Sequence, residues 1–271
     1  MIRLICLTTL LLGSFVAVIA DDHDHSAALK KAAEGDHRSD AHKARNQHRH
    51  PVETLSFFGI KPNMTVVEVS PGGSAWYSEI LAPFLREEGK LYLAGYDVND
   101  KREYVVKNRE KLAQKLADNP DVYDKVQVTE FNPPKKKGIA PEGSVDMVLT
   151  FRNTHGWMRG GIAPNAFEIF YKVLKPGGVL GVVQHRADPN IEAEARPSGG
   201  YVNQDYLIKM AEHAGFILVA SSEINANPKD TKDHPKGVWS LPPTYADGDE
   251  HKAKFEKIGE SDRMTLKFVK P

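Results

Sequence analysis

The chain has 271 residues, 41% of them hydrophobic, and carries 36 Lys plus Arg against 36 Asp plus Glu. That balance excludes a strongly basic nucleic-acid-binding protein and a protein held to a membrane surface by a block of charge. A single cysteine, Cys6, excludes an intrachain disulfide framework, so packing must stabilise the fold.

Residues 1–20 have the pattern of a secretory signal peptide. One cation, Arg3, precedes an apolar run over residues 4–19, which closes on Val18, Ile19 and Ala20. The run is shorter than the ~20 residues of a comfortable membrane span. We therefore predict a cleaved signal and a periplasmic or secreted protein without stable membrane insertion. An uncleaved anchor is the alternative.

Residues 21–50 are polar, lack aromatic side chains and carry six of the eleven histidines: His23, His25, His37, His42, His48 and His50. This composition predicts a mobile or loosely helical arm. Imidazoles bind zinc and copper, but the spacing is irregular and no cysteine joins them. We favour a solvated tail that binds metal opportunistically and predict no specific metal site.

Residues 51–271 alternate apolar strands with amphipathic helices and read as one domain. Strands are predicted over residues 65–69, 91–96, 126–131, 145–151 and 179–184, from residue 216, and over 264–269. Helices are predicted around residues 77–85, where Pro83 should introduce a kink, and over 102–117, 164–174 and 203–214. Strand–helix alternation predicts an α/β fold with a parallel sheet covered on both faces. Ligands of such sheets bind beyond the carboxyl ends of the strands.

The first strand ends in a glycine-rich turn, residues 68–74, which contains Glu68, Ser70, Gly72 and Gly73. Glycines let a ligand approach the backbone, and the following helix N-terminus favours an anionic group. A tight turn without a ligand would need the same residues.

The second strand ends at Asp97. An acid at this position can accept hydrogen bonds from both hydroxyls of a ribose. A helix cap or a solvated loop acid is the alternative.

These ordered motifs resemble the class I S-adenosylmethionine (SAM)-dependent methyltransferases over residues 51–271. The resemblance rests on the 68–74 turn, on Tyr96-Asp97, and on residues 143–149, 173–180 and 207–216. It implies a Rossmann-like fold with a mostly parallel seven-stranded sheet, one antiparallel edge strand and helices on both faces. Residues 57–62, 151–153 and 261–266 are similar to a group of exported bacterial predicted methyltransferases.

The resemblance also implies where SAM would bind. Gly72 and Gly73 would face its methionine part, Asp97 its ribose, and Asn132, which we favour over Glu130, its adenine. The sequence departs from the family at Ser70 and Ser74, where glycines are usual.

Polar residues follow strands four and five, where the sheet would face a methyl acceptor: Arg152, Asn153, His155 and His185. His155 has an unperturbed pKa suited to a general base. Structural roles for His155 and Arg152 are the alternative. Arg186 could clamp an anionic substrate or form a surface ion pair.

The predicted function is therefore a SAM-dependent methyltransferase that acts on a small-molecule or envelope substrate, with no nucleic-acid partner. Because SAM is made in the cytosol, a catalytically silent binding module with the same fold is an alternative. A nicotinamide-dependent oxidoreductase fits less well, since the turn over residues 175–178 and a strand running to the chain end are methyltransferase-like.

Overall fold

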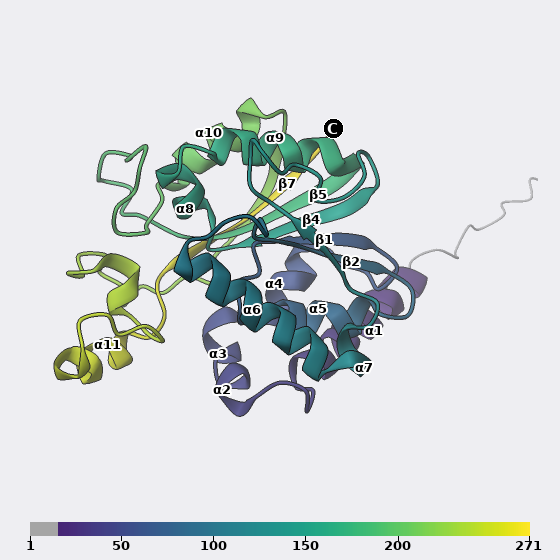
Figure 1. Cartoon of the computed structure of the whole chain (residues 1–271), viewed down its shortest axis with the longest axis horizontal. Helices are drawn as coiled ribbons and strands as arrows, with labels where there is room; N and C mark the ends of the chain where they lie inside the picture. The colour runs from purple at the N-terminus through teal and green to yellow at the C-terminus, as the bar shows by residue number, and fades with distance from the viewer. Residues whose placement is uncertain (1–15) are drawn as a thin grey trace, which may run out of the picture.

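The computed structural model describes residues 16–271. In this part of the chain one sheet of seven strands has the order β3-β2-β1-β4-β5-β7-β6 (Figure 1). The strands are β1 (Thr65–Val69), β2 (Lys90–Gly95), β3 (Gln127–Glu130), β4 (Val145–Phe151), β5 (Leu174–His185), β6 (Ile217–Ser222) and β7 (Arg263–Val269).

The directions of the strands confirm the predicted architecture. β1 pairs in parallel with β2 and β4, and the parallel pairing continues to β3 on one side and to β5 on the other. β7 is antiparallel to both of its neighbours and is inserted between β5 and the edge strand β6. An antiparallel strand in this place disfavours the dehydrogenase alternative. β5 begins at Leu174, so it includes the predicted turn over residues 175–178.

Helices cover both faces of the sheet, as predicted (Figure 1). Buried side chains of α1 (Val16–Ala33), α4 (Pro51–Phe58), α5 (Ser78–Leu85) and α6 (Glu103–Asp118) form one core. Those of α9 (Ala163–Val173) and α10 (Gln204–His213) form the other. The remaining helices are short: α2 (Asp40–Lys43), α3 (Asn46–Arg49), α7 (Pro120–Tyr123), α8 (Thr154–Arg159) and α11 (Lys252–Ile258), with 3-10 turns at Gly237–Ser240 and Asp249–His251.

The central strands are apolar along nearly their whole length because both of their faces are covered. All residues of β4 except Asp146 are buried, and β1 is buried from Val66 to Val69. Parallel strands place their carboxyl ends at one edge of the sheet, so the segments after β1, β2, β3 and β4 meet there.

The arm, predicted to be mobile or loosely helical, contains helices and is packed against the domain. Residues 25–50 pack against α5 through Leu29, Ala32 and Ala33, which are buried, and through Arg38 and Arg49, each at most 2% exposed. Composition alone indicated a solvated tail because the segment lacks aromatic residues. The apolar partner of this segment is α5 together with the turn before it. The centroid of the Trp76 ring, on that turn, lies 4.7 Å from the guanidinium carbons of Arg38 and Arg49.

Pro83 lies inside α5 and explains one role of this N-terminal segment. A proline has no N–H, so the carbonyl four residues earlier loses its helical donor. That carbonyl belongs to Glu79, and the His37 ring nitrogen lies 2.7 Å from it. A histidine of the predicted arm therefore completes the hydrogen bonding of a helix in the domain.

The predicted signal peptide falls largely outside the described residues, and only its last five positions lie in α1. Within the described chain, no helix combines the length and the apolar character that crossing a membrane requires.

Candidate functional site

The turn after β1 is shaped by two residues with positive φ. Gly72 has a φ of 68°, and Ser70 has a φ of 51°, a conformation that favours glycine. The Ser70 N–H donates to the Ala94 carbonyl at 2.8 Å and so ties the turn to β2. A serine held in this region indicates local strain of a kind that clusters at binding and catalytic sites.

The two glycines of the turn have different surroundings: Gly73 packs closely against α6, whereas Gly72 is less crowded. A Cβ on Gly73 would lie 2.9 Å from the Lys111 side chain, and the Gly73 N–H donates to Asn108 Oδ1 at 2.9 Å, so packing against α6 requires this glycine. Around Gly72 the nearest atom to an added Cβ is 3.9 Å away. Gly72 and Tyr96 line a cavity of about 180 Å³. This is less than the ~300 Å³ at which ligand pockets typically start, so a whole nucleoside would need the turn to open.

Asp97 and Asn132, predicted to lie after neighbouring strands, are brought together. Asn132 Nδ2 donates to Asp97 Oδ2 at 2.9 Å, and the Asn99 N–H donates to Oδ1 at 2.9 Å. These donors, Asn132 first, lower the pKa of Asp97 below its usual value. The carboxylate is thus ionised and held in place, and a ribose would have to compete with or share the Asn132 hydrogen bond.

Glu68 is only 3% exposed, and its Oε2 accepts a hydrogen bond from the Ser78 hydroxyl at 2.6 Å. Burial raises its pKa to about 7, although the Ser78 hydrogen bond and the nearby Arg152 charge act in the opposite direction. Near neutral pH this carboxyl is therefore divided between its protonated and ionised forms.

The segment after β4 is tied to the turn after β1. Asn153 Nδ2 donates to the Val69 carbonyl at 2.9 Å, so this predicted acceptor-site amide holds the two strand ends together. Arg152 has a φ of 65°, a second non-glycine residue in the left-handed region at this rim. Burial lowers the pKa of Arg152 to about 10, against the effect of Glu260.

His155 lies in a hydrogen-bond network that fixes its tautomer. Gln184 Oε1 accepts from the Thr154 N–H at 3.1 Å, so its Nε2 faces His155 Nδ1 at 3.3 Å as a donor. Nδ1 is then the acceptor, and Nε2 carries the proton. Burial, together with the Arg159 charge, lowers the pKa of His155 to about 4. The residue is therefore neutral at this rim, with Nδ1 engaged by Gln184 and a pKa that makes it a weak base, and its role as a general base stays a prediction.

His185, at the end of β5, contacts both His155 and the start of β7. Its ring lies 5.6 Å from that of His155, and its Nδ1 makes a hydrogen bond with the Ser261 hydroxyl. Burial holds its pKa well below the usual value. The two predicted histidines are therefore adjacent and both neutral.

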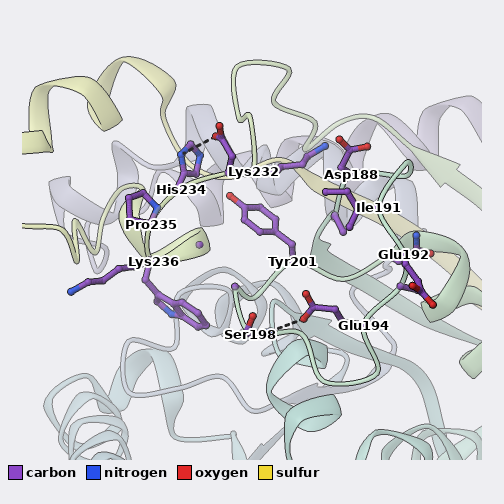
Figure 2. Close-up of a pocket in the computed structure, with 17 residues that line it drawn as sticks. Asp188, Ile191, Glu192, Glu194, Ser198, Tyr201, Lys232, His234, Pro235 and Lys236 are labelled. Atoms are coloured by element: carbon purple, nitrogen blue, oxygen red, sulfur yellow. Dashed lines mark hydrogen bonds and ion pairs between the residues drawn. The ribbon is translucent and has the colours of Figure 1, made fainter.

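A cavity of about 580 Å³ lies beyond these histidines, between the loop after β5 and the long connection from β6 to β7 (Figure 2). Tyr201 and Trp239 belong to its lining, and their rings contact His185 and His155, respectively. The aromatic, proline-containing sequence of residues 233–245 also predicts an insertion that covers part of a substrate pocket, and this stretch supplies part of the wall. The two aromatic rings separate the cavity from the histidines.

Arg186 and Trp157 have structural roles. For Trp157 the sequence leaves open whether it stacks on a substrate or covers the core. Arg186 is engaged by two carboxylates, Asp262 at 3.0 Å and Glu223 at 2.7 Å, which is the ion-pair alternative to a substrate clamp. Trp157 packs in the core against Phe131 and Phe170.

The sequence analysis missed a group of charged residues at the same rim: Arg45, Arg49, Glu260 and Arg263. Glu260 lies 2.6 Å from Arg45, 3.1 Å from Arg49 and 2.7 Å from Arg263. Arg45, which precedes α3, and Arg49, its last residue, lie in the segment that is predicted to be a solvated tail. Over the described residues, no group of three or more His, Cys, Asp or Glu side chains is arranged to hold a metal ion.

No family model and no curated protein matches the sequence. Among solved structures, the chain is similar to a SAM-dependent methyltransferase from Aquifex aeolicus at 16% identity, with 91% of this chain and 98% of that chain covered and a TM-score of 0.55. It is also similar to the cyclase SpnF at 15% identity, with 93% and 96% covered and a TM-score of 0.55. The chain therefore has the Rossmann-like fold of the class I SAM-dependent methyltransferases.

Proposed function

We propose that this protein is a SAM-dependent methyltransferase that acts on a small-molecule or envelope acceptor. The observation that carries the proposal is the hydrogen bond between Asn132 and Asp97 at the carboxyl rim of a sheet with the methyltransferase strand order, where Tyr96, the residue before Asp97, lines a cavity together with Gly72. When bound, SAM supplies an electrophilic methyl group.

The chain's own residues fit parts of SAM by their chemistry. The turn with Ser70 and Gly72 offers close backbone approach to the methionine part, with Gly73 and the buried Glu68 behind it. The ionised Asp97 accepts hydrogen bonds from ribose hydroxyls, and the amide of Asn132 pairs with adenine.

At the acceptor side, the residues are suited to position the methyl acceptor and to polarise it. His155 and His185 are neutral, and the fixed tautomer of His155 presents Nε2–H as a donor. Arg152 adds a positive charge, and Asn153 holds the rim closed at Val69. This set suits a reaction in which alignment of an acceptor with the methyl group supplies most of the acceleration. The signal-like N-terminus supports an exported location.

The test is calorimetric titration of the chain with SAM. We expect binding that Asp97→Ala weakens about tenfold or more, because hydrogen bonds to a charged group contribute ~1.5–3 kcal/mol. Asp118→Ala, which removes an exposed acid at the end of α6, is the matched control and should leave the affinity unchanged. Equal affinities of the two variants, or no heat at millimolar SAM, would rule out the proposed site.

A catalytically silent binding module is the second candidate. Two observations favour it: Asp97 is already hydrogen-bonded to Asn132, and the cavity at Gly72 is small. Likeness to a protein named as a cyclase also indicates that this fold serves other chemistry. Mass spectrometry of molecules that co-purify with the protein separates the candidates, since a ligand other than SAM or its demethylated product supports the second.

A further inference from the structure

Three arginines contact a single carboxylate, and a fourth lies near it, where α3, the end of β4 and the start of β7 meet. Glu260 accepts hydrogen bonds from Arg45 Nε at 2.6 Å, Arg49 Nε at 3.1 Å and Arg263 Nη2 at 2.7 Å. Arg152 is close enough for its pKa to respond to Glu260, Arg263 and Arg45. These five residues are called the arginine cluster below.

The arginine cluster is not neutral. It contains four guanidinium groups and one carboxylate, and the next acid along the chain, Asp262, is engaged by Arg186 and Lys232 at 3.0 Å each. Glu68, also near Arg152, is only partly ionised at neutral pH, because burial raises its pKa to about 7. Burying a cation without a counter-charge costs free energy. A buried ion-pair network that only stabilised the fold would therefore be expected to contain equal numbers of positive and negative side chains.

Several donors of the arginine cluster have no acceptor. Arg49 is 1% exposed, and both of its Nη atoms lack a hydrogen-bond partner, as does Nη2 of Arg45. The Trp76 ring, 4.7 Å from the Arg49 guanidinium carbon, offers a cation–π contact but no oxygen acceptor. Buried polar nitrogens without partners in a folded protein indicate a missing ligand or water.

The arginine cluster borders the candidate methyl-transfer site. Arg152 directly follows Phe151, whose ring stacks on Tyr77 at 3.5 Å, and the Tyr77 hydroxyl donates to the Arg49 carbonyl at 3.2 Å. Arg152 also lowers the pKa of both His155 and His185. Arg152 and Arg45 are partly exposed, whereas Arg49 and Arg263 are buried, so the cluster has a side that faces solvent.

We propose that the arginine cluster binds a carboxylate or phosphoryl group of the methyl acceptor, so that the acceptor is an anionic molecule. The planar guanidinium fork matches either oxyanion with paired N–H donors. This inference rests on the proposed methyltransferase function for the identity of the ligand, but the binding of an oxyanion can be tested without it.

The experiment titrates inorganic phosphate into the full chain by calorimetry and follows the thermal unfolding midpoint, with chloride at matched ionic strength as reference. Phosphate should bind and raise the midpoint more than chloride does. Arg152→Gln and Arg45→Gln, at the two partly exposed positions, should each weaken phosphate binding about tenfold or more. Arg86→Gln, which removes a partly exposed arginine paired with Glu87 and Asp124 beyond the C-terminal end of α5, should not.

Equal effects of phosphate and chloride, or equal phosphate affinity in folded Arg152→Gln, Arg45→Gln and Arg86→Gln, would overturn the oxyanion site. Repeating the titration on SAM-saturated protein identifies the source of the anion. Unchanged phosphate affinity supports an acceptor group. Competition by SAM, but not by 5′-methylthioadenosine, which lacks the carboxylate, would assign the cluster to SAM and overturn the acceptor proposal. Phosphate binding without any SAM binding would retain the anion site and reject the methyltransferase function.

Discussion

At the scale of single residues, Glu68 is a carboxyl placed where its ionised form is disfavoured. Its pKa is raised from 4.5 to about 7 because the side chain is buried behind the glycine turn. The folded protein therefore holds a proton that the unfolded chain releases above pH 4.5. Stability is consequently lost as the pH rises from about 4.5 to 7, with an upper limit of about 3 kcal/mol for this shift.

Glu68→Gln removes this dependence and keeps an oxygen for the Ser78 hydroxyl. We expect the variant to gain free energy of unfolding relative to the native chain as the pH rises from 5 to 8, measured by urea denaturation. Glu53→Gln, at an exposed position of α4, is the control and should show no such trend. A constant difference between pH 5 and pH 8 would mean that Glu68 titrates normally.

The positions of the site residues were more predictable than their chemistry. Asp97 and Asn132 were placed after neighbouring strands, and the carboxyl ends of parallel strands bring them within hydrogen-bond distance. The base role predicted for His155 depended on its free pKa, but Gln184, which fixes its tautomer, lies 29 positions along the chain. No local pattern reveals such a partner.

At the scale of elements, Glu79 joins three segments. It accepts hydrogen bonds from Arg38 at 3.0 Å and His42 at 2.9 Å in the N-terminal segment, and from Lys115 of α6. Burial alone would raise its pKa, but the hydrogen bonds from His42 and Lys115 outweigh that effect and lower the pKa to about 2. The ionised Glu79 carboxylate therefore stabilises the folded protein above pH 4.5, and this contribution is lost as the pH falls toward 2.

Glu79→Gln should therefore destabilise the protein by about 3–5 kcal/mol at pH 7, because it leaves buried cations without their counter-charge. The loss should be smaller at pH 3. Glu87→Gln removes a carboxylate that is 71% exposed and paired with Arg86, and it should be neutral in the same denaturation experiment. Similar stabilities of the two variants at pH 7 would show that the N-terminal segment is not docked through Glu79.

The strands of residues 51–271 and the helices α5, α6, α9 and α10 could be predicted because their apolar periodicity is strong, whereas the short helices and the packing of the N-terminal segment could not. Apart from α1, its helices have four residues each, and the segment is held by partners in α5, such as the Glu79 carbonyl that lies beside the His37 ring. In the sequence, Arg45 and Arg49 look like the polar residues of a solvated tail. Their structural role depends on hydrogen bonds to Glu260, which lies more than 200 positions away.

At the scale of the whole molecule, the candidate site residues lie at one rim of the sheet, at the carboxyl ends of the parallel strands. The opposite rim holds connections that contain no candidate site residue. Sequence alone anticipated this polarity because it follows from strand direction. For the outer cavity it indicated the wall formed by the connection before β7, but not the wall formed by the loop after β5. Neither wall has a periodic pattern, so their approach depends on tertiary packing.

This polarity predicts which backbone amides a bound cosubstrate protects from hydrogen exchange. With saturating SAM, protection should increase in residues 69–74, 96–99 and 131–133, because these segments follow β1, β2 and β3 at the candidate site. Residues 62–64 and 88–89, which precede β1 and β2, and residues 175–178, in the first part of β5, lie at the opposite rim and serve as an internal control with unchanged exchange. Because local opening sets exchange rates, a ligand that bridges several segments slows all of them together. Protection confined to residues 187–203 and 232–239 would instead place the ligand in the outer cavity and detach Asp97 from its proposed role.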